Sequence, residues 1–198
     1  MKTLVKTLLL VCLAIQVHAQ NDDDKPAKIT DWKFAGLAAL NFSTVSGDIG
    51  DNESGLLDFS IGSVINVPTN LNFNIQIEPQ FSRVGSRREG ETLRRYTFLD
   101  IPVMMQVFKQ NKVSIEFGPK VAITLDQKQL VSGELTKVDR LKPITLGMAA
   151  GTTYNFDSNW FGQFRLNIWG SDIIRKDGGD TEGTSVLLFQ FGVGYWFN

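Results

Sequence analysis

The sequence predicts an all-β protein, an eight-stranded antiparallel up-and-down transmembrane β-barrel with short periplasmic turns and long outer loops. Three observations predict this fold: apolar and polar residues alternate with period two, short and long connections alternate, and no segment has the 3.6-residue period of a helix. The alternating segments are residues 32–43, 56–67, 71–82, 93–108, 113–125, 144–156, 160–169 and 185–197.

The chain begins with the features of a secretory signal peptide. Lys2 and Lys6 precede an apolar run over residues 8–15, and a small-residue cleavage site ends at Ala19. The run is too short to be a transmembrane helix, so cleavage is expected between Ala19 and Gln20. The expected division of the chain is a signal peptide over residues 1–19, a flexible lead-in over 20–31 and the barrel domain over 32–198.

The composition excludes several classes of function. The only cysteine, Cys12, and the only histidine, His18, lie in the expected signal peptide. The exported chain therefore has no disulfide, no histidine base for a Ser–His enzyme and few zinc ligands. Without Lys2 and Lys6, 18 basic residues face 21 acidic ones, a balance that does not favour nucleic acid. No enzyme activity, cofactor or metal is expected.

Each segment opposes an apolar row, made of every second residue, to a polar row. Side chains alternate across a strand, so each segment is predicted to be a strand with two different faces. Aromatic residues lie at the ends of many apolar rows, as in the girdles of membrane barrels. In chain order the apolar rows run from Trp32 to Phe42, Leu57 to Val67, Leu71 to Phe81, Leu99 to Val107, Val113 to Leu125, Ile144 to Phe156, Phe164 to Ile168 and Leu187 to Phe197.

The connections between the segments alternate in length. Tight turns rich in Pro, Asn, Asp and Lys are predicted at residues 68–70, 109–112 and 157–159. Long polar loops are predicted at residues 44–55, 83–92, 126–140 and 171–183. This alternation is typical of outer-membrane barrels, in which an even number of strands leaves both termini on the periplasmic side.

The segment L-N-F-N-I-Q-I-E-P-Q-F-S at residues 71–82 raises the question of which face points into the barrel. A soluble lipocalin-like carrier has its apolar row inside, against a lipophilic ligand, whereas a membrane barrel has it against lipid. The segment lengths are close to the 9–11 residues of a tilted membrane-spanning strand, and the polar rows of small and amide side chains fit a narrow lumen. We therefore expect lipid contact for Leu71, Phe73, Ile75 and Ile77, and lumen positions for Asn72, Asn74, Gln76 and Glu78.

Two strands resemble known outer-membrane proteins. Residues 99–107, L-D-I-P-V-M-M-Q-V, are similar to the Leu-x-Ile-Pro strand of the PorT-like outer-membrane β-barrel proteins. The resemblance implies an outer-membrane barrel and no reaction, and the namesake of that family serves type IX secretion. Residues 190–197, Q-F-G-V-G-Y-W-F, resemble the outer-membrane insertion signal, with its four positions occupied by Gln190, Gly192, Tyr195 and Phe197.

Four charged residues of the polar rows are placed near mid-barrel by their distance from the turns: Glu78, Asp100, Lys120 and Arg165. They are expected to form an ion-pair network that plugs the lumen, because buried charges must pair. The functional alternatives are a narrow polar pore or proton path, and a carboxylate pair for hydrolysis.

Five arginines lie in or beside the second long loop: Arg83, Arg87, Arg88, Arg94 and Arg95. The favoured interpretation is a solvated hairpin that Glu89 and Glu91 partly neutralise. The functional alternative is contact with lipopolysaccharide, because arginine pairs well with phosphate.

Four prolines conflict with the predicted strands: Pro79, Pro102, Pro119 and Pro143 lie within or near them. Proline cannot donate to a strand ladder, and a closed barrel has no free edge for it. We expect bulges at some of these prolines, or positions above the bilayer.

The sequence favours a non-enzymatic role for a monomeric barrel in the outer membrane of a Gram-negative bacterium. The expected partners are outer-membrane lipid, lipopolysaccharide and, during insertion, the barrel-assembly machinery. The expected function is structural or surface-interacting, through the long outer loops. The alternatives are a soluble lipocalin-like carrier, and a small channel or type IX secretion accessory.

Overall fold

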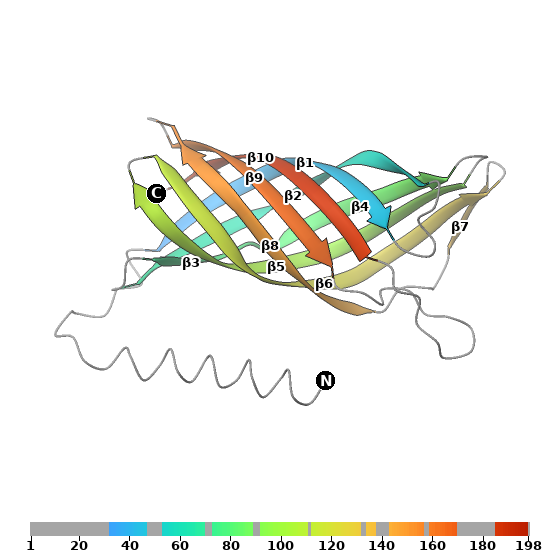
Figure 1. Ribbon diagram of the computed structural model, residues 1–198, viewed down its shortest axis with the longest axis horizontal. Helices are drawn as coiled ribbons and strands as arrows, with labels where there is room; N and C mark the ends of the chain where they lie inside the picture. Colours follow the sequence, from blue (N-terminus) through green and yellow to red (C-terminus); the bar gives the residue numbers. More distant parts are fainter. Residues whose placement is uncertain are drawn as a thin grey trace, which may run out of the picture.

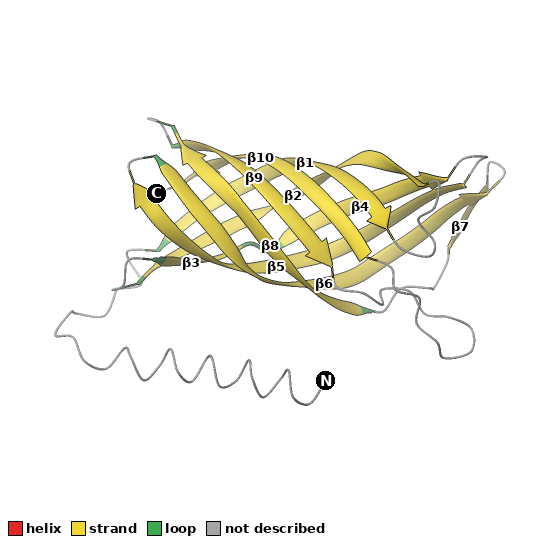
Figure 2. Ribbon diagram, in the orientation of Figure 1, coloured by secondary structure: helices red, strands yellow, loops and turns green. Residues whose placement is uncertain are grey.

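The structure, a computed structural model, describes residues 32–46, 53–69, 73–88, 92–110, 112–131, 134–137, 143–156, 159–169 and 185–197. These residues form a closed barrel of tilted strands (Figure 1). Strands make up nearly all of the described part (Figure 2). The expected signal peptide and lead-in, residues 1–31, lie outside the described residues.

The strands follow one another around the barrel as an antiparallel meander. Every neighbouring pair runs antiparallel, and the pairing of the first strand with the last closes the barrel. The strands are β1 (Lys33–Ser46), β2 (Glu53–Pro68), β3 (Asn74–Ile77), β4 (Gln80–Arg88), β5 (Thr92–Gln110), β6 (Val113–Val131), β7 (Glu134–Lys137), β8 (Ile144–Asn155), β9 (Trp160–Trp169) and β10 (Ser185–Trp196).

In the described part of the chain, these ten strands build a wall of eight. β3 and β4 are two halves of one wall strand, because both pair with β2 on one side and with β5 on the other. β7 pairs with residues 128–131 of β6, beyond the wall. The predicted eight-stranded antiparallel barrel is therefore confirmed.

Two of the predicted long loops are mostly strand. β4 continues to Arg88 and β5 begins at Thr92, while β6 and β7 occupy much of residues 126–140. Register pairs such as Tyr96 with Gln127 continue the ladder, and here charged residues such as Arg83 and Arg95 occupy the outward row, so the apolar–polar alternation is lost. The loop predicted at 171–183 lies outside the described residues, as do residues 47–52 of the first loop.

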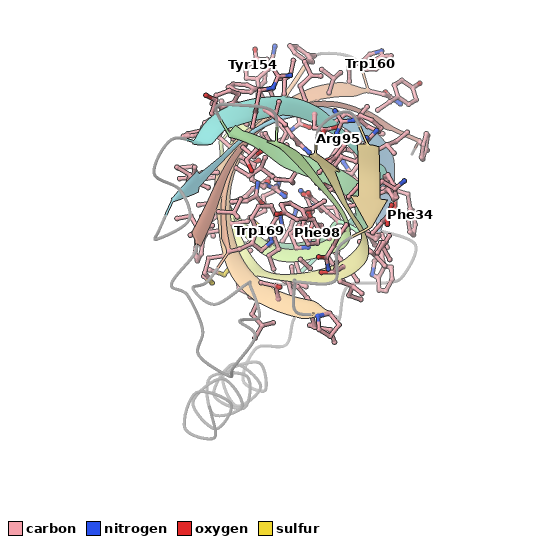
Figure 3. All side chains as sticks on the ribbon, turned by 90° about the vertical axis from the view of Figure 1, so that its right-hand side faces the viewer. Phe34, Arg95, Phe98, Tyr154, Trp160 and Trp169 are labelled. Atoms are coloured by element: carbon pink, nitrogen blue, oxygen red, sulfur yellow. The ribbon has the colours of Figure 1, made fainter. Side chains whose placement is uncertain are left out.

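The polar rows face the lumen and the apolar rows face outward. Gln76 and Glu78 are 1% and 0% exposed, whereas Ile75, which precedes Gln76, is 37% exposed. In the view along the barrel, Phe34, Tyr154 and Trp160 lie on the outside of the wall (Figure 3). A lipocalin-like carrier needs an apolar lumen, so that alternative is wrong. Leu71 and Asn72 lie outside the described residues.

Pro79 interrupts the hydrogen-bond ladder without a bulge. It separates β3 from β4, yet Ile65 pairs with Ile77 and Gly62 pairs with Gln80 in one unbroken register. Its carbonyl still accepts a hydrogen bond from the Ser63 amide at 3.1 Å. The wall therefore loses one donor at this proline and keeps its alignment.

The expected bulges at prolines are also wrong for β5 and β6. Pro102 pairs in register with Lys120, and Pro119 pairs with Met148. Pro143 precedes β8, and its carbonyl accepts from the Thr124 amide at 2.9 Å. The register shifts of the wall lie elsewhere, between Gly55 and Ser60, Thr97 and Phe98, and Val107 and Gln110.

A charged residue introduced on the outward face of the wall tests whether that face contacts lipid. Met148 is 57% exposed near the middle of β8, between Pro119 and Ile168 of the neighbouring strands. Met148→Arg is expected to lower the free energy of unfolding by about 2–4 kcal/mol, because a charge at the bilayer midplane loses its hydration. Urea unfolding in phospholipid vesicles measures this, with Met148→Leu as the control. Equal stability of both variants would mean that water covers this face.

Candidate functional site

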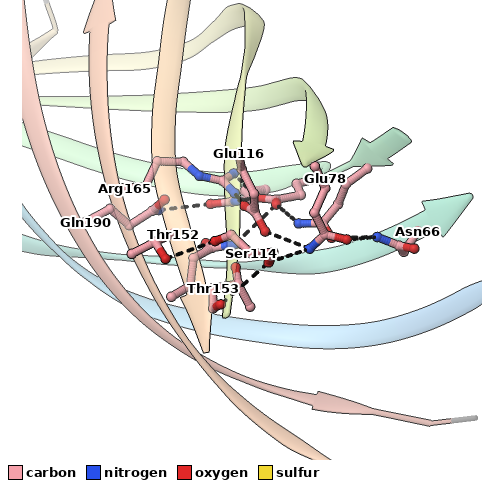
Figure 4. Close-up of polar contacts among 12 residues, drawn as sticks. Asn66, Glu78, Ser114, Glu116, Thr152, Thr153, Arg165 and Gln190 are labelled. Atoms are coloured by element: carbon pink, nitrogen blue, oxygen red, sulfur yellow. Dashed lines mark hydrogen bonds and ion pairs between the residues drawn. The ribbon is translucent and has the colours of Figure 1, made fainter. Parts of the chain in front are cut away.

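The guanidinium of Arg165 joins two carboxylates at the centre of the lumen. Arg165 on β9 is fully buried, as are Glu78, at the break between β3 and β4, and Glu116 on β6. Nη1 of Arg165 donates to Glu78 Oε2, and Nη2 donates to Glu116 Oε2 (Figure 4). The forked geometry of the guanidinium allows one cation to hold carboxylates from two parts of the wall.

Glu78 accepts further hydrogen bonds from three glutamine side chains. Gln76 and Gln163 donate to its Oε1 at 2.6 and 3.2 Å, and Gln80 donates to its Oε2 at 2.8 Å. Together with Arg165, these donors fill the lone pairs of the carboxylate. Such saturation offsets the loss of hydration on burial of a charge.

A second ion pair lies on the same lumen face of the wall. Lys120 Nζ lies 3.1 Å from Asp100 Oδ2 and donates to Asn167 Oδ1 at 3.3 Å. Nζ also lies 4.0 Å from the centroid of the Trp169 ring, a cation–π contact. The four residues that the sequence placed in the lumen thus all lie there, as members of two ion-pair clusters rather than one.

Glu116 is the lumen residue that sequence reasoning missed. Besides Arg165, it binds Gln106, whose Nε2 donates to Glu116 Oε1 at 3.0 Å. Glu116 is on the polar row of its strand, but distance from the turn does not reveal how far Arg165 reaches across the lumen. With Glu116, three of the four buried carboxylates among the described residues face the two buried cations Arg165 and Lys120, and the fourth, Asp58, pairs with arginines farther out.

An apolar cluster closes the outer end of the described lumen. It contains Val84, Phe98, Ala122, Trp169 and Leu188, each at most 6% exposed, from five different strands. The rings of Phe98 and Trp169 pack with their centroids 5.8 Å apart inside the barrel (Figure 3).

A second apolar cluster closes the periplasmic end. Phe161 packs there with Ala35, Leu37 and Val64, and its ring centroid lies 4.9 Å from that of Trp196. Gly194 makes room for the Phe161 ring, because an added Cβ would lie 2.1 Å from Phe161 Cζ. The signal for both clusters was present in the sequence: Phe161 and Trp169 lie on the polar row of Arg165, at its two ends.

The lumen therefore contains buried polar and charged side chains, with an apolar cluster toward each end. Such a buried network can hold the wall together, and its side chains are inaccessible to solvent. No helix in the described part of the chain has the length and hydropathy to cross a membrane. The described residues contain no group of three His, Cys, Asp or Glu side chains that could hold a metal ion.

The five arginines expected at lipopolysaccharide do not form one patch. Arg83 and Arg95 both contact Asp58, at 3.6 and 3.2 Å. Arg87 lies on β4 and is exposed. Arg88 and Arg94 occupy the alternate register positions of β4 and β5, and their side chains lie outside the described residues.

The residues of the expected insertion signal lie on β10 and at its end. Gln190 is buried and donates to Gln80 Oε1 at 3.0 Å, and Gly192 is also buried. Tyr195 and Phe197 are 39% and 66% exposed on the outward face. The two aromatic residues therefore belong to the lipid-facing row, as the alternation predicts.

Comparison with solved structures finds the same fold. Neisserial surface protein A (NspA) is similar with a TM-score of 0.59 and 13% sequence identity, over 82% of this chain and 96% of that one. Ail, the attachment invasion locus protein of Yersinia pestis, is similar with a TM-score of 0.52 and 13% identity, over 83% and 98%. No curated protein sequence matches the chain.

A family model for the outer membrane protein beta-barrel domain matches residues 18–170. The match covers most of the chain, and the closed barrel with an apolar outer face and a polar lumen has the form that such a domain requires. The chain belongs to the outer membrane protein beta-barrel domain family.

Proposed function

We propose that this protein is a non-enzymatic outer-membrane barrel that acts through its outer end, in contact with other surface components, and does not conduct solutes. The observation that carries the proposal is the closed lumen, with its buried ion pairs between two apolar clusters. The outer ends of β5 and β6 and the short strand β7 extend beyond the wall, where they are accessible from outside (Figure 1).

The absence of conductance is the first test of this proposal. Purified protein in planar lipid bilayers is expected to give no discrete conductance steps, because packed side chains occupy the lumen. The matched comparison is the double variant Phe161→Ala and Trp169→Ala, which removes one large side chain from each apolar cluster. Its mobility in an unboiled gel shows whether this variant folds. Regular conductance steps from the unaltered protein would refute the proposal and favour the channel alternative.

The role of the outer end has a separate test. A short turn in place of residues 86–94 is expected to change which surface components are crosslinked to the barrel on intact cells, while the lumen and the unboiled gel mobility stay the same. An unchanged set of crosslinked components would contradict a role for this end.

A second candidate, an accessory role in type IX secretion, is favoured by the resemblance of residues 99–107 to the PorT-like strand. Asp100 and Pro102 of that strand face the lumen, where Asp100 binds Lys120. Deletion of the chain in its native host is expected to block type IX export if this finer assignment holds. Both candidates include export with removal of residues 1–19, which the intact mass of the purified protein measures.

A further inference from the structure

The strand register brings together cations that are far apart in the sequence. Gly85 pairs with Arg95, Arg95 pairs with Lys128, and Lys128 pairs with Lys137, across β4, β5, β6 and β7. Residues directly opposite each other share one face of a sheet, and like charges in that arrangement destabilise it. The row therefore lowers the stability of the outer sheet except where carboxylates or bound anions balance its charge.

Two more arginines join this row. Arg83 and Arg87 flank Gly85 at two-residue spacing on β4, so they lie on the same face. The same face carries Phe81, 40% exposed, one step closer to the bilayer. Along β4 the lipid-facing row thus changes from an aromatic residue to cations, which places them at the level of the lipid headgroups.

Part of this surface is held in a fixed arrangement. Arg83 and Arg95 converge on Asp58, and the Arg83 guanidinium lies 5.4 Å from the centroid of the Phe59 ring. Their side chains nevertheless remain 29% and 39% exposed, and that of Lys128, paired with Asp126 at 3.1 Å, is 55% exposed. Pre-positioned, partly exposed guanidinium groups lose little freedom when they bind an oxyanion.

From these observations we infer that the face defined by Arg83, Arg87, Arg95 and Lys128 binds the phosphate groups of lipid A in the outer leaflet. Four cations face the two carboxylates Asp58 and Asp126, so a surplus of positive charge remains for an anionic headgroup. Lys128 was not among the arginines singled out from the sequence, and Arg88 and Arg94 occupy the alternate register positions of β4 and β5. The inference rests on the proposed surface role and names its partner.

The test compares two pairs of substitutions that remove equal charge. The full chain is folded in phosphatidylcholine vesicles with increasing rough-type lipopolysaccharide, and the temperature at which the unboiled gel band is lost reports binding. Arg87→Gln with Lys128→Gln is expected to raise the lipopolysaccharide needed for half of the stabilisation by about tenfold. Arg88→Gln with Arg94→Gln is expected to leave it unchanged. Arg83 and Arg95 are left intact because they pair with Asp58.

Further arms identify the source of the phosphate. Dephosphorylated lipopolysaccharide is expected to stabilise no more than phosphatidylcholine alone, and inorganic phosphate without lipopolysaccharide is expected to have no effect. Equal loss in the two pairs, full stabilisation by dephosphorylated lipid, or stabilisation by inorganic phosphate alone would overturn the inference. If the first pair fails to fold, Lys128→Gln alone is compared with Arg94→Gln. If the lipopolysaccharide test fails but the barrel does not conduct in planar bilayers, the proposed surface role still stands. If the barrel conducts, the proposed surface role is itself rejected.

Discussion

Replacement of Arg165 by Met is expected to lower the free energy of unfolding of the barrel by about 3–5 kcal/mol. The reason is that the guanidinium is the cation shared by Glu78 and Glu116, both fully buried. Without it, two carboxylates remain in the closed lumen with amide donors alone, and Lys120 already pairs with Asp100. Urea unfolding in vesicles, followed by tryptophan fluorescence, measures the change.

The control for Arg165→Met is a variant in which the two carboxylate partners of Arg165 are also made neutral. The triple variant Arg165→Met, Glu78→Gln and Glu116→Gln is expected to regain most of the lost stability, because no unpaired charge remains in that cluster. Lys128→Met removes a positive charge from an exposed side chain and is expected to have little effect. If Arg165→Met were as stable as the unaltered protein, the network would not hold the wall together.

Gly118→Ala is expected to produce the second large loss, through the backbone rather than through charge. Gly118 on β6 is buried opposite β5, where an added Cβ would lie 2.0 Å from the carbonyl oxygen of Val103 and 3.0 Å from Met104 Cα. One methyl group therefore forces the two longest strands of the wall apart. Overpacking of this kind costs about 1–3 kcal/mol or more, and the temperature at which the unboiled gel band is lost is expected to fall.

Gly162→Ala on β9 is the matched control for Gly118. Its added Cβ would meet the Phe156 ring at 3.7 Å, an ordinary van der Waals contact. The same chemical change is therefore expected to leave the unboiled band as heat-resistant as in the unaltered protein. A similar loss in both variants would point to glycine flexibility in strands rather than to the close approach of β5 and β6.

The wall of the barrel was predictable because it depends on local pattern. Alternation over residues 144–156 and 160–169 located β8 and β9 almost to the residue, since every second side chain of a strand meets the same solvent. The same pattern failed above the bilayer. Where β4 and β5 pair as Arg83 with Thr97, the outward row is polar while Val84 and Phe98 of the inward row are buried, so the apolar–polar alternation of the wall no longer holds.

The contents of the lumen were only partly predictable. The polar rows placed Glu78, Asp100, Lys120 and Arg165 inside, but alternation contains no information about which side chains meet across the barrel. Glu116 became a partner of Arg165 because a long guanidinium crosses the lumen, a distance that depends on closure and strand tilt.

The sequence by itself determined the eight wall strands, their order and the face that each row presents, because these follow from period-two alternation and connection length. The tertiary structure alone decided what the closed wall encloses and what its outer sheet displays. Closure brings Arg165 to two carboxylates, stacks Phe98 against Trp169, and aligns Arg95 with Lys128 and Lys137. These contacts join residues far apart in the chain, so they depend on register and curvature, which no local pattern specifies.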